Sequence, residues 1–376
     1  MAELPVCAIN RCHLEALTGP LGIWQHASAA APNTEFGYCT DDVARALIVD
    51  LLHARELGWP AVAASASRSL GFLREAFDLD TRRFRNFRAG DGSWNEETGS
   101  EDSQGRAVWA LASAIGAAGD AQFAGDARRL FAAALPVAGG LRALRASSSA
   151  LIGCDVALDT HLLDPTLRAD TVATFEGLAM TLSNAFSGVD VHSDWPWPEP
   201  VLTYENALLP HALLTAGRRL DDDGLRQTGR WVLEWLMRVH MAPNGTFSPV
   251  GSNGWWRRGG ARSRFDQQPI EATAMLLGCE TAFREFGDER YLAAIEAAYG
   301  WFLGRNDLGL AVAVVERGAC HDGLTPCGVN LNQGAESTLM WLITLEHVRR
   351  IRRETAAGSP VDARPLSMSV LVESRR

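Results

Sequence analysis

Apolar residues recur at helical spacing along almost the whole chain, and this recurrence constrains the fold more than any other feature. Stretches rich in Ala, Leu and Arg carry apolar residues at positions i, i+3, i+4 and i+7, while strand-like alternation is scarce. Twelve helices are predicted, over residues 6–17, 42–57, 60–77, 103–117, 121–135, 141–152, 171–186, 205–219, 223–240, 270–286, 289–303 and 334–352.

The predicted helices are of two alternating kinds. One kind follows a long segment rich in Gly, Trp or acids, and its members begin about 65 residues apart, or about twice that around the helix at 141–152. The other kind follows a short link. This alternation predicts six helical hairpins that close into an all-α (α/α)6 toroid, with parallel inner helices whose N-termini open at one end. Residues 1–353 are expected to form one domain and residues 354–376 a poorly ordered tail, while residues 78–99 are expected to form a short hairpin at the rim.

Composition excludes several classes of function. The chain has 376 residues, a net charge of -10 and a pI near 5.4, so nucleic-acid binding is not expected. All its basic residues are Arg, which excludes a Schiff-base lysine and a Walker-type phosphate loop. Seven scattered Cys without a CxxC pair predict no disulfide framework or structural zinc. No signal peptide or membrane span is seen, so a cytoplasmic protein without a cofactor is expected.

Acid pairs stand at the starts of two predicted inner helices. YCTDDVAR carries Asp41 and Asp42, and EDSQGRA carries Glu101 and Asp102. Helix capping alone would account for them, because acids are favoured in the first turn of a helix. The alternative is that several such starts meet at one mouth and form an active site. There Arg45 and Arg106, which follow one turn later, would hold one acid of each pair ionised.

The other inner helices begin with acids and amides as well. The relevant stretches are YENALLP, FDQQPIEA, with a Pro suited to the first helical position, and NQGAES. Side chains of this kind offer hydrogen-bond donors and acceptors to the hydroxyls of a sugar. The segment WPWPEP adds two stiffly held Trp rings beside carboxylates, which suits stacking on a pyranose. Packing of these rings at the rim is the structural alternative.

The predicted reaction is cleavage of a glycosidic bond by two carboxyl groups, one of which acts as the general acid. The catalytic candidates are Asp42, Asp102 and Glu271, followed by Glu101 and Glu205. The substrate-binding candidates are Tyr38, Asp41, Arg45, Arg106, Trp195, Trp197, Glu199, Tyr204, Asn206, Asp266, Gln267, Gln268, His321, Asn332, Gln333 and Glu336.

The same motifs carry a resemblance that spans roughly residues 36–350. YCTDDxAR, EDSxGRAxWAL, WPWPExxLTYENALLP, FDQQPIEA and NQGAES resemble a bacterial group of α-toroid proteins within the six-hairpin glycosidase superfamily. Members of this group are often encoded beside or fused to carbohydrate-active enzymes, and are sometimes labelled glycosyltransferases. The resemblance implies the toroid fold, chemistry on an oligosaccharide or sugar, and association with another carbohydrate-active enzyme.

Other readings remain open. A phosphorylase would need a cationic phosphate site, for which the dense cluster Arg257, Arg258, Arg262 and Arg264 is the candidate. A sugar epimerase or isomerase would use His as acid and base, with His161, His192, His211 and His321 as candidates. A non-catalytic glycan-binding partner would bind sugar without turnover. Cys320 and His321 also resemble the Cys-His element of zinc-dependent lanthionine cyclases, but no second Cys loop is evident, and no metal site is expected.

Overall fold

A computed structural model describes residues 4–117 and 119–357 of the chain. These residues fall into two compact units. The first unit is formed by residues 4–17, His26–Pro32 and 184–357, and the second by Thr18–Gln25, 33–117 and 119–183. The expectation of one domain over residues 1–353 stays a prediction. Of the predicted tail, residues 354–356 belong to the last helix, and residues 358–376 lie outside the described part of the chain.

The second unit is built from helical hairpins and a few short strands. Its helices are α2 (Thr40–Leu57), α3 (Ala63–Ala76), α4 (Glu101–Ile115), α5 (Ala121–Ala138), α6 (Leu144–Leu158) and most of α7 (Pro165–Phe186), with the 3-10 turn η1 (Trp59–Ala61). Only parts of β1 (Trp24–Ser28) and β2 (Ala31–Cys39) belong to this unit, because residues 26–32 are assigned to the first unit, and β2 pairs antiparallel with β5 (Phe87–Arg88). The predicted rim hairpin is present as β3 (Phe77–Asp78) and β4 (Arg83–Phe84).

The first unit has the same hairpin plan. It contains α1 (Cys12–Leu17), α8 (Leu208–Leu220), α9 (Asp223–Val239), α10 (Pro269–Phe286), α11 (Glu289–Phe302), α12 (Ala335–Ala356) and η2 (Val315–Arg317). Three antiparallel pairs lie in the links between helices: β6 (Val201–Leu202) with β7 (Trp256–Arg257), β8 (Ala313–Val314) with β9 (Ala319–Cys320), and β10 (Gly323–Thr325) with β11 (Gly328–Asn330). Among the described residues, no helix is long and apolar enough to span a bilayer.

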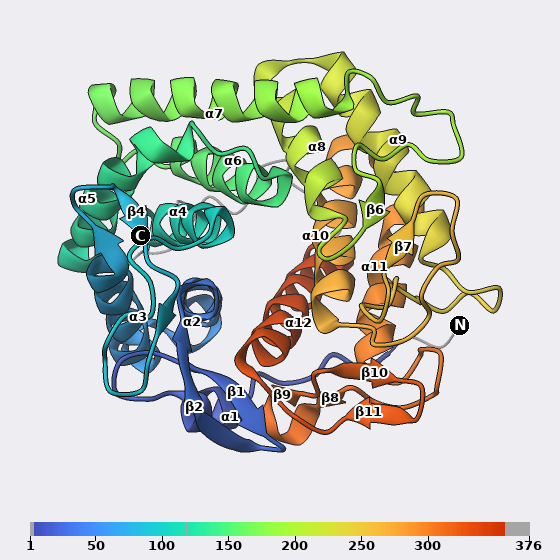
Figure 1. Cartoon of the computed structure of the whole chain (residues 1–376), viewed down its shortest axis with the longest axis horizontal. Coiled ribbons are helices and arrows are strands. Elements are labelled where there is room, and N and C mark those ends of the chain that lie inside the picture. The colour runs from blue at the N-terminus through green and yellow to red at the C-terminus, as the bar shows by residue number, and fades with distance from the viewer. Residues whose placement is uncertain (1–3, 118, 358–376) are drawn as a thin grey trace. The chain divides into compact units, whose positions relative to one another are not determined.

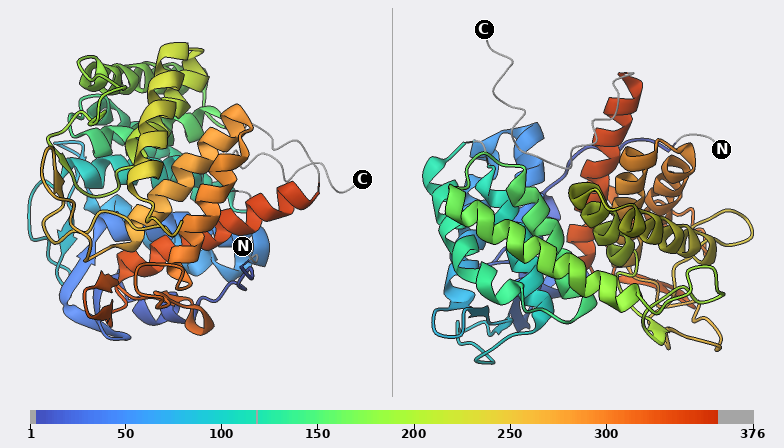
Figure 2. Two further views of the ribbon diagram at one scale, coloured as in Figure 1. Left: turned by 90° about the vertical axis from the view of Figure 1, so that its right-hand side faces the viewer. Right: turned by 90° about the horizontal axis from the view of Figure 1, so that it is seen from above.

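Burial separates the inner helices from the outer ones, as predicted. Every residue of α6 from Arg145 to Leu158 is buried, whereas α9 buries mainly one face through residues such as Val232 and Leu236. The inner helices α10 and α12 lie side by side (Figures 1 and 2). They run parallel, because Thr273 of α10 bonds to the Met340 carbonyl of α12 and Glu280, seven residues further on, bonds to His347.

Several predicted helix boundaries were wrong, and the helix predicted to begin at residue 171 begins at Pro165. The first helix is only Cys12–Leu17 rather than 6–17, and the residues before Cys12 that the structure describes are not helical. The sixth helix runs over Leu144–Leu158 instead of 141–152, because the Leu141–Ala143 segment is a link rather than a first turn. The helix predicted at 205 begins at Leu208, because Glu205 adopts a left-handed backbone conformation with a φ of 50°.

Helices α4 and α6 approach so closely that their contact requires glycine. A Cβ atom on Gly105 of α4 would lie 2.3 Å from the Ala146 carbonyl oxygen of α6. A Cβ atom on Gly153 of α6 would lie 2.7 Å from the Cα of Trp109 of α4. Both contacts are with backbone atoms, so only a shift of a whole helix would relieve them. The order of the two contacts along each helix also shows that α4 and α6 run parallel.

We predict that Gly105→Ala lowers the free energy of unfolding by about 1–3 kcal/mol, the usual cost of overpacking a core. Gly71→Ala and Gly177→Ala are matched controls, because these helical glycines of α3 and α7 have no atom within 4 Å of the added Cβ. Each control should stabilise the protein by about 0.5–1 kcal/mol through helix propensity. Urea unfolding of the three variants measures this, and an unchanged midpoint for Gly105→Ala would contradict the close approach of α4 and α6.

Candidate functional site

The start of α2 holds a buried acid beside a buried base. The backbone N–H of Thr40 donates to the Asn86 carbonyl at 2.8 Å, which ties the start of α2 to the rim segment. Asp42 is buried, and its Oδ1 accepts from a guanidinium nitrogen of Arg45, also buried, at 3.1 Å. Arg45 therefore neutralises Asp42 within the same turn of the helix, as the spacing of the two residues predicts.

A second acid–base pair joins α2 to α4. Oδ2 of Asp41 lies 3.5 Å from Nε of Arg106, which is buried. Both predicted arginines thus face a carboxylate of the TDD stretch. Tyr38 is fully buried and stacks on Trp24 with ring centroids 4.1 Å apart, so its ring belongs to the core of the second unit rather than to its surface.

The two acids at the start of α4, Glu101 and Asp102, lie in different environments. The Oε2 atom of Glu101 accepts hydrogen bonds from the backbone N–H groups of Arg142 and Ala143, at 2.8 and 2.6 Å. Ala143 is the N-cap residue of α6 and has no side-chain cap of its own, so the Glu101 carboxylate caps α6 from outside that helix. Asp102 is half-buried in the first turn of α4.

In the first unit, most of the DQQPIEA stretch is engaged in holding loops. Pro269 is the first residue of α10, as predicted, and Gln268 is its N-cap. Gln267 is fully buried: its Nε2 donates to Asp307 at 2.7 Å and its Oε1 accepts from the Trp301 indole at 2.8 Å. Asp266 has a φ of 57°, a strained backbone conformation for an acid. Glu271 accepts bonds from the turn before α8, described below.

The start of α12 carries a half-buried carboxyl group, that of Asp322. Its Oδ1 accepts from the N–H of Gly334, the N-cap of α12, at 2.8 Å. Burial raises the pKa of Asp322 above its ordinary value, and the negative charge of Glu336 adds to this, while bonds from Gly334 and Ser337 and the charge of His26 act in the opposite direction. Asp322 is therefore disposed to hold a proton.

His321 precedes this carboxyl group. Its backbone N–H donates to the Val312 carbonyl at 2.9 Å, and the residue is half-buried. Its Nδ1 atom is buried and has no hydrogen-bond partner within residues 4–117 and 119–357. A buried ring nitrogen without a hydrogen-bond partner in the described residues, one residue before a carboxyl group whose pKa is raised by burial, is suited to proton transfer.

The NQG residues before α12 are held by the segment around β1. The Oδ1 of Asn332 accepts from the Ala29 N–H at 3.0 Å, and the Gln333 N–H donates to the Ala29 carbonyl at 3.0 Å. The Gln333 carbonyl lies 2.9 Å from Nε2 of His13, which is buried. The residues directly before α12, close to Asp322, are thus held by His13 and Ala29 from the N-terminal part of the first unit.

The other candidate histidines lie in different environments. His161 and His192 are exposed, and the His192 ring lies 4.7 Å from that of Trp231 on α9. His211 is buried in the first turn of α8, and burial lowers its pKa to about 4, so its ring is neutral at physiological pH.

Trp195 and Trp197 lie in a cluster of four indole rings. Trp195 is 6% exposed and Trp197 is 3% exposed. The Trp195 ring is 5.6 Å from Trp235 of α9 and 5.1 Å from Trp256 of β7, and the Trp197 ring is 6.4 Å from Trp235. The Glu199 carbonyl accepts from the Trp195 indole at 3.0 Å. The predicted rings therefore pack the long link against α9, and little of either ring is open to solvent.

The arginine cluster considered for phosphate is divided. Arg262 donates to the Ser248 carbonyl at 2.8 Å and also to the Val239 carbonyl, and Arg264 pairs with Asp307 at 3.0 Å. Arg257 and Arg258 are exposed. Two of the four guanidinium groups thus hold the link before α10.

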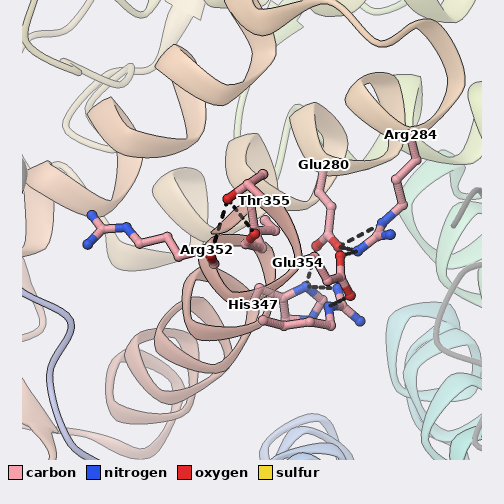
Figure 3. A network of polar contacts seen from close by, with 8 residues as sticks. Glu280, Arg284, His347, Arg352, Glu354 and Thr355 are labelled. Atoms are coloured by element: carbon pink, nitrogen blue, oxygen red, sulfur yellow. Dashed lines mark hydrogen bonds and ion pairs between the residues drawn. The ribbon is translucent and has the colours of Figure 1, made fainter. Parts of the chain in front are cut away.

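Sequence reasoning missed a network of buried charges between α10 and α12 (Figure 3). Oε2 of Glu280 lies 2.6 Å from Nδ1 of His347, and Oε1 of Glu280 accepts from Arg284 at 2.7 Å and also from Arg350. Glu354 joins through Arg284 at 2.8 Å. Burial opposes the charge of Glu280, but Arg350 and His347 outweigh it and hold its pKa well below the ordinary value. The sequence signals for this network were Glu280 and His347, an acid and a histidine inside helices that are otherwise largely apolar.

Within the described ranges, no group of three or more His, Cys, Asp or Glu side chains is placed to hold a metal ion. Cys320 is buried, and burial raises the pKa of its thiol well above the ordinary value. A protonated, buried thiol is a poor metal ligand, so the arrangement gives no support to a cyclase-like zinc site.

Comparison with known proteins identifies the fold. No protein-family model and no curated protein sequence matches this chain. Among solved structures, a cellobiose 2-epimerase from Spirochaeta thermophila is 17% identical, with 90% of this chain and 92% of that chain aligned and a TM-score of 0.67. A D-mannose isomerase is 12% identical over 90% and 95% of the chains, with a TM-score of 0.63. The GH76 α-mannanase BT2949 from Bacteroides thetaiotaomicron is 8% identical over 90% and 93%, with a TM-score of 0.62.

These similarities confirm the predicted fold class. The chain has the all-α (α/α)6 toroid fold that these solved structures share. Sequence identities below one fifth establish the fold that the chains share, but not the reaction of this chain. Association with another carbohydrate-active enzyme stays a prediction.

Proposed function

We propose that this chain is a sugar epimerase or isomerase, which moves a proton at the carbon next to the carbonyl group of a reducing sugar. The observation that carries the proposal is the pair at the start of α12: Asp322, whose pKa is raised by burial, and His321, whose Nδ1 is buried without a partner in the described residues. A cellobiose 2-epimerase and a D-mannose isomerase have the same fold, so the fold can accommodate this class of reaction.

The chemistry requires one base and one acid. His321 would remove the proton from the carbon beside the carbonyl carbon, and the electrons of that C–H bond would form the C=C bond of an enediol. Asp322 would give its proton to the carbonyl oxygen at the same time. Return of the proton from His321 to C2, after the enediol has turned its other face to the ring, with the O1 proton returning to Asp322, would give the epimer. Return of that proton to C1, with the O2 proton going to Asp322, would give the ketose. No oxidant or reductant enters this balance.

Occupied carboxylates weigh against the predicted hydrolase. Glu101 is bonded to two backbone N–H groups of the α6 cap, and Glu271 is bonded to the turn before α8. Glycoside hydrolysis remains the second candidate because Asp41, Asp42 and Asp102 stand at two adjacent helix starts with Arg45 and Arg106. In that case Asp42 and Asp102 would be the reactive pair.

The test is proton NMR of glucose, mannose and cellobiose incubated with the protein in D2O at neutral pH. Epimerase or isomerase chemistry should exchange the hydrogen at C2 for deuterium and produce the epimer or the ketose. Asp322→Asn should lower this rate by about 10²–10⁴-fold, the usual contribution of an acid–base group. Glu316→Gln is the matched control, because Glu316 is an exposed acid on the same link, and it should keep the wild-type rate.

Other outcomes would overturn the proposal. New reducing ends without exchange at C2, abolished by Asp42→Asn and Asp102→Asn, would establish a hydrolase. Sugar binding without exchange or cleavage would favour a glycan-binding partner.

A further inference from the structure

The turn before α8 is fastened by its own side chains. The Oδ1 atom of Asn206 accepts from the Thr203 N–H at 3.2 Å, and its Nδ2 donates to the Thr203 carbonyl at 2.8 Å. One amide thus satisfies both backbone groups of Thr203. Asn206 is fully buried, so these bonds are shielded from water and competition by solvent is small.

Glu205 occupies a costly conformation in this turn. Its φ of 50° lies in the left-handed region, which costs a residue other than glycine about 1–3 kcal/mol. Its side chain is nevertheless withdrawn from solvent, with the residue 6% exposed. A buried acid on a strained backbone needs an external restraint, because neither feature is favourable by itself.

Glu271 of α10 supplies that restraint. One of its carboxylate oxygens accepts the backbone N–H of Glu205, and the other accepts from Nδ2 of Asn206 at 2.9 Å. Glu271 is 2% exposed. The Glu271 carboxylate of α10 is therefore directed at the turn before α8. It bonds to the backbone of the strained residue Glu205 and to the side chain of Asn206, which follows it.

We propose that Glu271 is a positioning residue that holds the Glu205 carboxyl group in place for contact with a sugar hydroxyl. This rests on the proposed function, in that the helix starts of the first unit receive the sugar. It assigns to Glu271 a role different from the catalytic one expected from the sequence: Glu271 acts through the turn, and Glu205 touches the substrate.

The test compares Glu271→Gln with Glu205→Gln. A glutamine at position 271 keeps one acceptor but presents an NH2 group to the amide of Asn206 or to the N–H of Glu205, so the turn loses one bond and gains a repulsion. A glutamine at position 205 removes the carboxyl group but leaves the backbone bond to Glu271 in place. We expect about a 10²-fold loss of kcat/KM in Glu271→Gln, typical of misplaced binding groups, and a loss of at least that size in Glu205→Gln.

Thr273→Val is the matched control for stability. Thr273 lies two residues further along α10, is buried, and bonds to the Met340 carbonyl at 3.0 Å, away from the turn. This variant should lose stability without a comparable loss of kcat/KM. An equal loss in Thr273→Val, or a wild-type kcat/KM in Glu205→Gln, would overturn the positioning role.

A readout that does not need turnover separates this inference from the proposed function. Hydrogen exchange of the peptide around Glu205 should accelerate in Glu271→Gln and stay at the wild-type rate in Glu205→Gln. Unchanged exchange in Glu271→Gln would overturn the restraint whatever the activity. Accelerated exchange, in a protein whose wild type neither binds nor converts sugars by NMR, would overturn the proposed function and leave the restraint supported.

Discussion

Glu280→Gln should lower the free energy of unfolding by about 3–5 kcal/mol, the cost of breaking a buried ion pair by removing one partner. Glu280 is 4% exposed and receives bonds from Arg284, Arg350 and His347. Without its charge, two guanidinium groups and an imidazole remain close together beside Glu354. The Arg350 guanidinium lies 3.0 Å from Nδ1 of His347, so both groups lose the anion that they share.

Thermal and urea unfolding at neutral pH would measure this loss. Glu296→Gln is the control, because Glu296 of α11 is paired with Arg352 at 2.6 Å but about a third of its side chain is exposed. An exposed pair of this kind contributes only about 0–1 kcal/mol. Equal effects of the two substitutions would show that the network around Glu280 does not join α10 to α12 energetically.

Much of the fold follows from local signals in the sequence. Long links precede the inner helices because they form the rim, and short links precede the outer ones, so the alternation was visible without any contact information. Pro269 marks the start of α10, and Gly334 marks that of α12. The start of α8 was misjudged by three residues, because the left-handed turn at Glu205 depends on a bond from Glu271, which is 66 residues away.

Roles of the acids were less predictable than their places. Both Glu101 and Asp102 were expected at a helix start, and both lie in the first turn of α4. The Glu101 carboxylate nevertheless caps α6, because it lies beside the N–H of Ala143, and the sequence does not reveal this contact. Trp195 and Trp197 were expected beside carboxylates, but their partner Trp235 belongs to the face of α9 that the sequence could not orient. Asp322 was not among the candidate site residues, because its perturbed pKa arises from burial, which the sequence does not show.

Stability should fall steeply as the pH is lowered from about 6.5 to 4, because two histidines are buried in their neutral form. Burial lowers the pKa of His211 to about 4, and burial together with the charge of Arg262 lowers that of His240 to about 3, from 6.5 in both cases. In this range the unfolded chain binds protons that the folded chain does not, so stability is lost as the pH falls. Since one pKa unit corresponds to about 1.4 kcal/mol, His211 accounts for about 3 kcal/mol and His240 for about 5 kcal/mol when fully titrated.

The two histidines have different surroundings, and this allows the prediction to be tested. His211 faces Glu280 and Glu205, which favour its protonation, and His347 and Arg218, which oppose it. Neither ring nitrogen of His240 has a hydrogen-bond partner in the part of the chain that is described, and its ring meets that of Phe247 edge to face at 5.9 Å. His240→Phe should therefore remove about half of the pH dependence between 6.5 and 4 while keeping an apolar contact.

Urea midpoints measured at intervals of pH provide the comparison between these variants. His161→Gln is the control, because His161 is exposed and should leave the slope unchanged. The ion pairs of Glu280 add a further loss only below about pH 4.5, where that carboxylate begins to take up a proton in the unfolded chain, so the slope above pH 4.5 excludes the Glu280 contribution. A slope between pH 6.5 and 5 that His240→Phe does not reduce would mean that His240 is protonated in the folded protein, and hence that water or an acid reaches its ring.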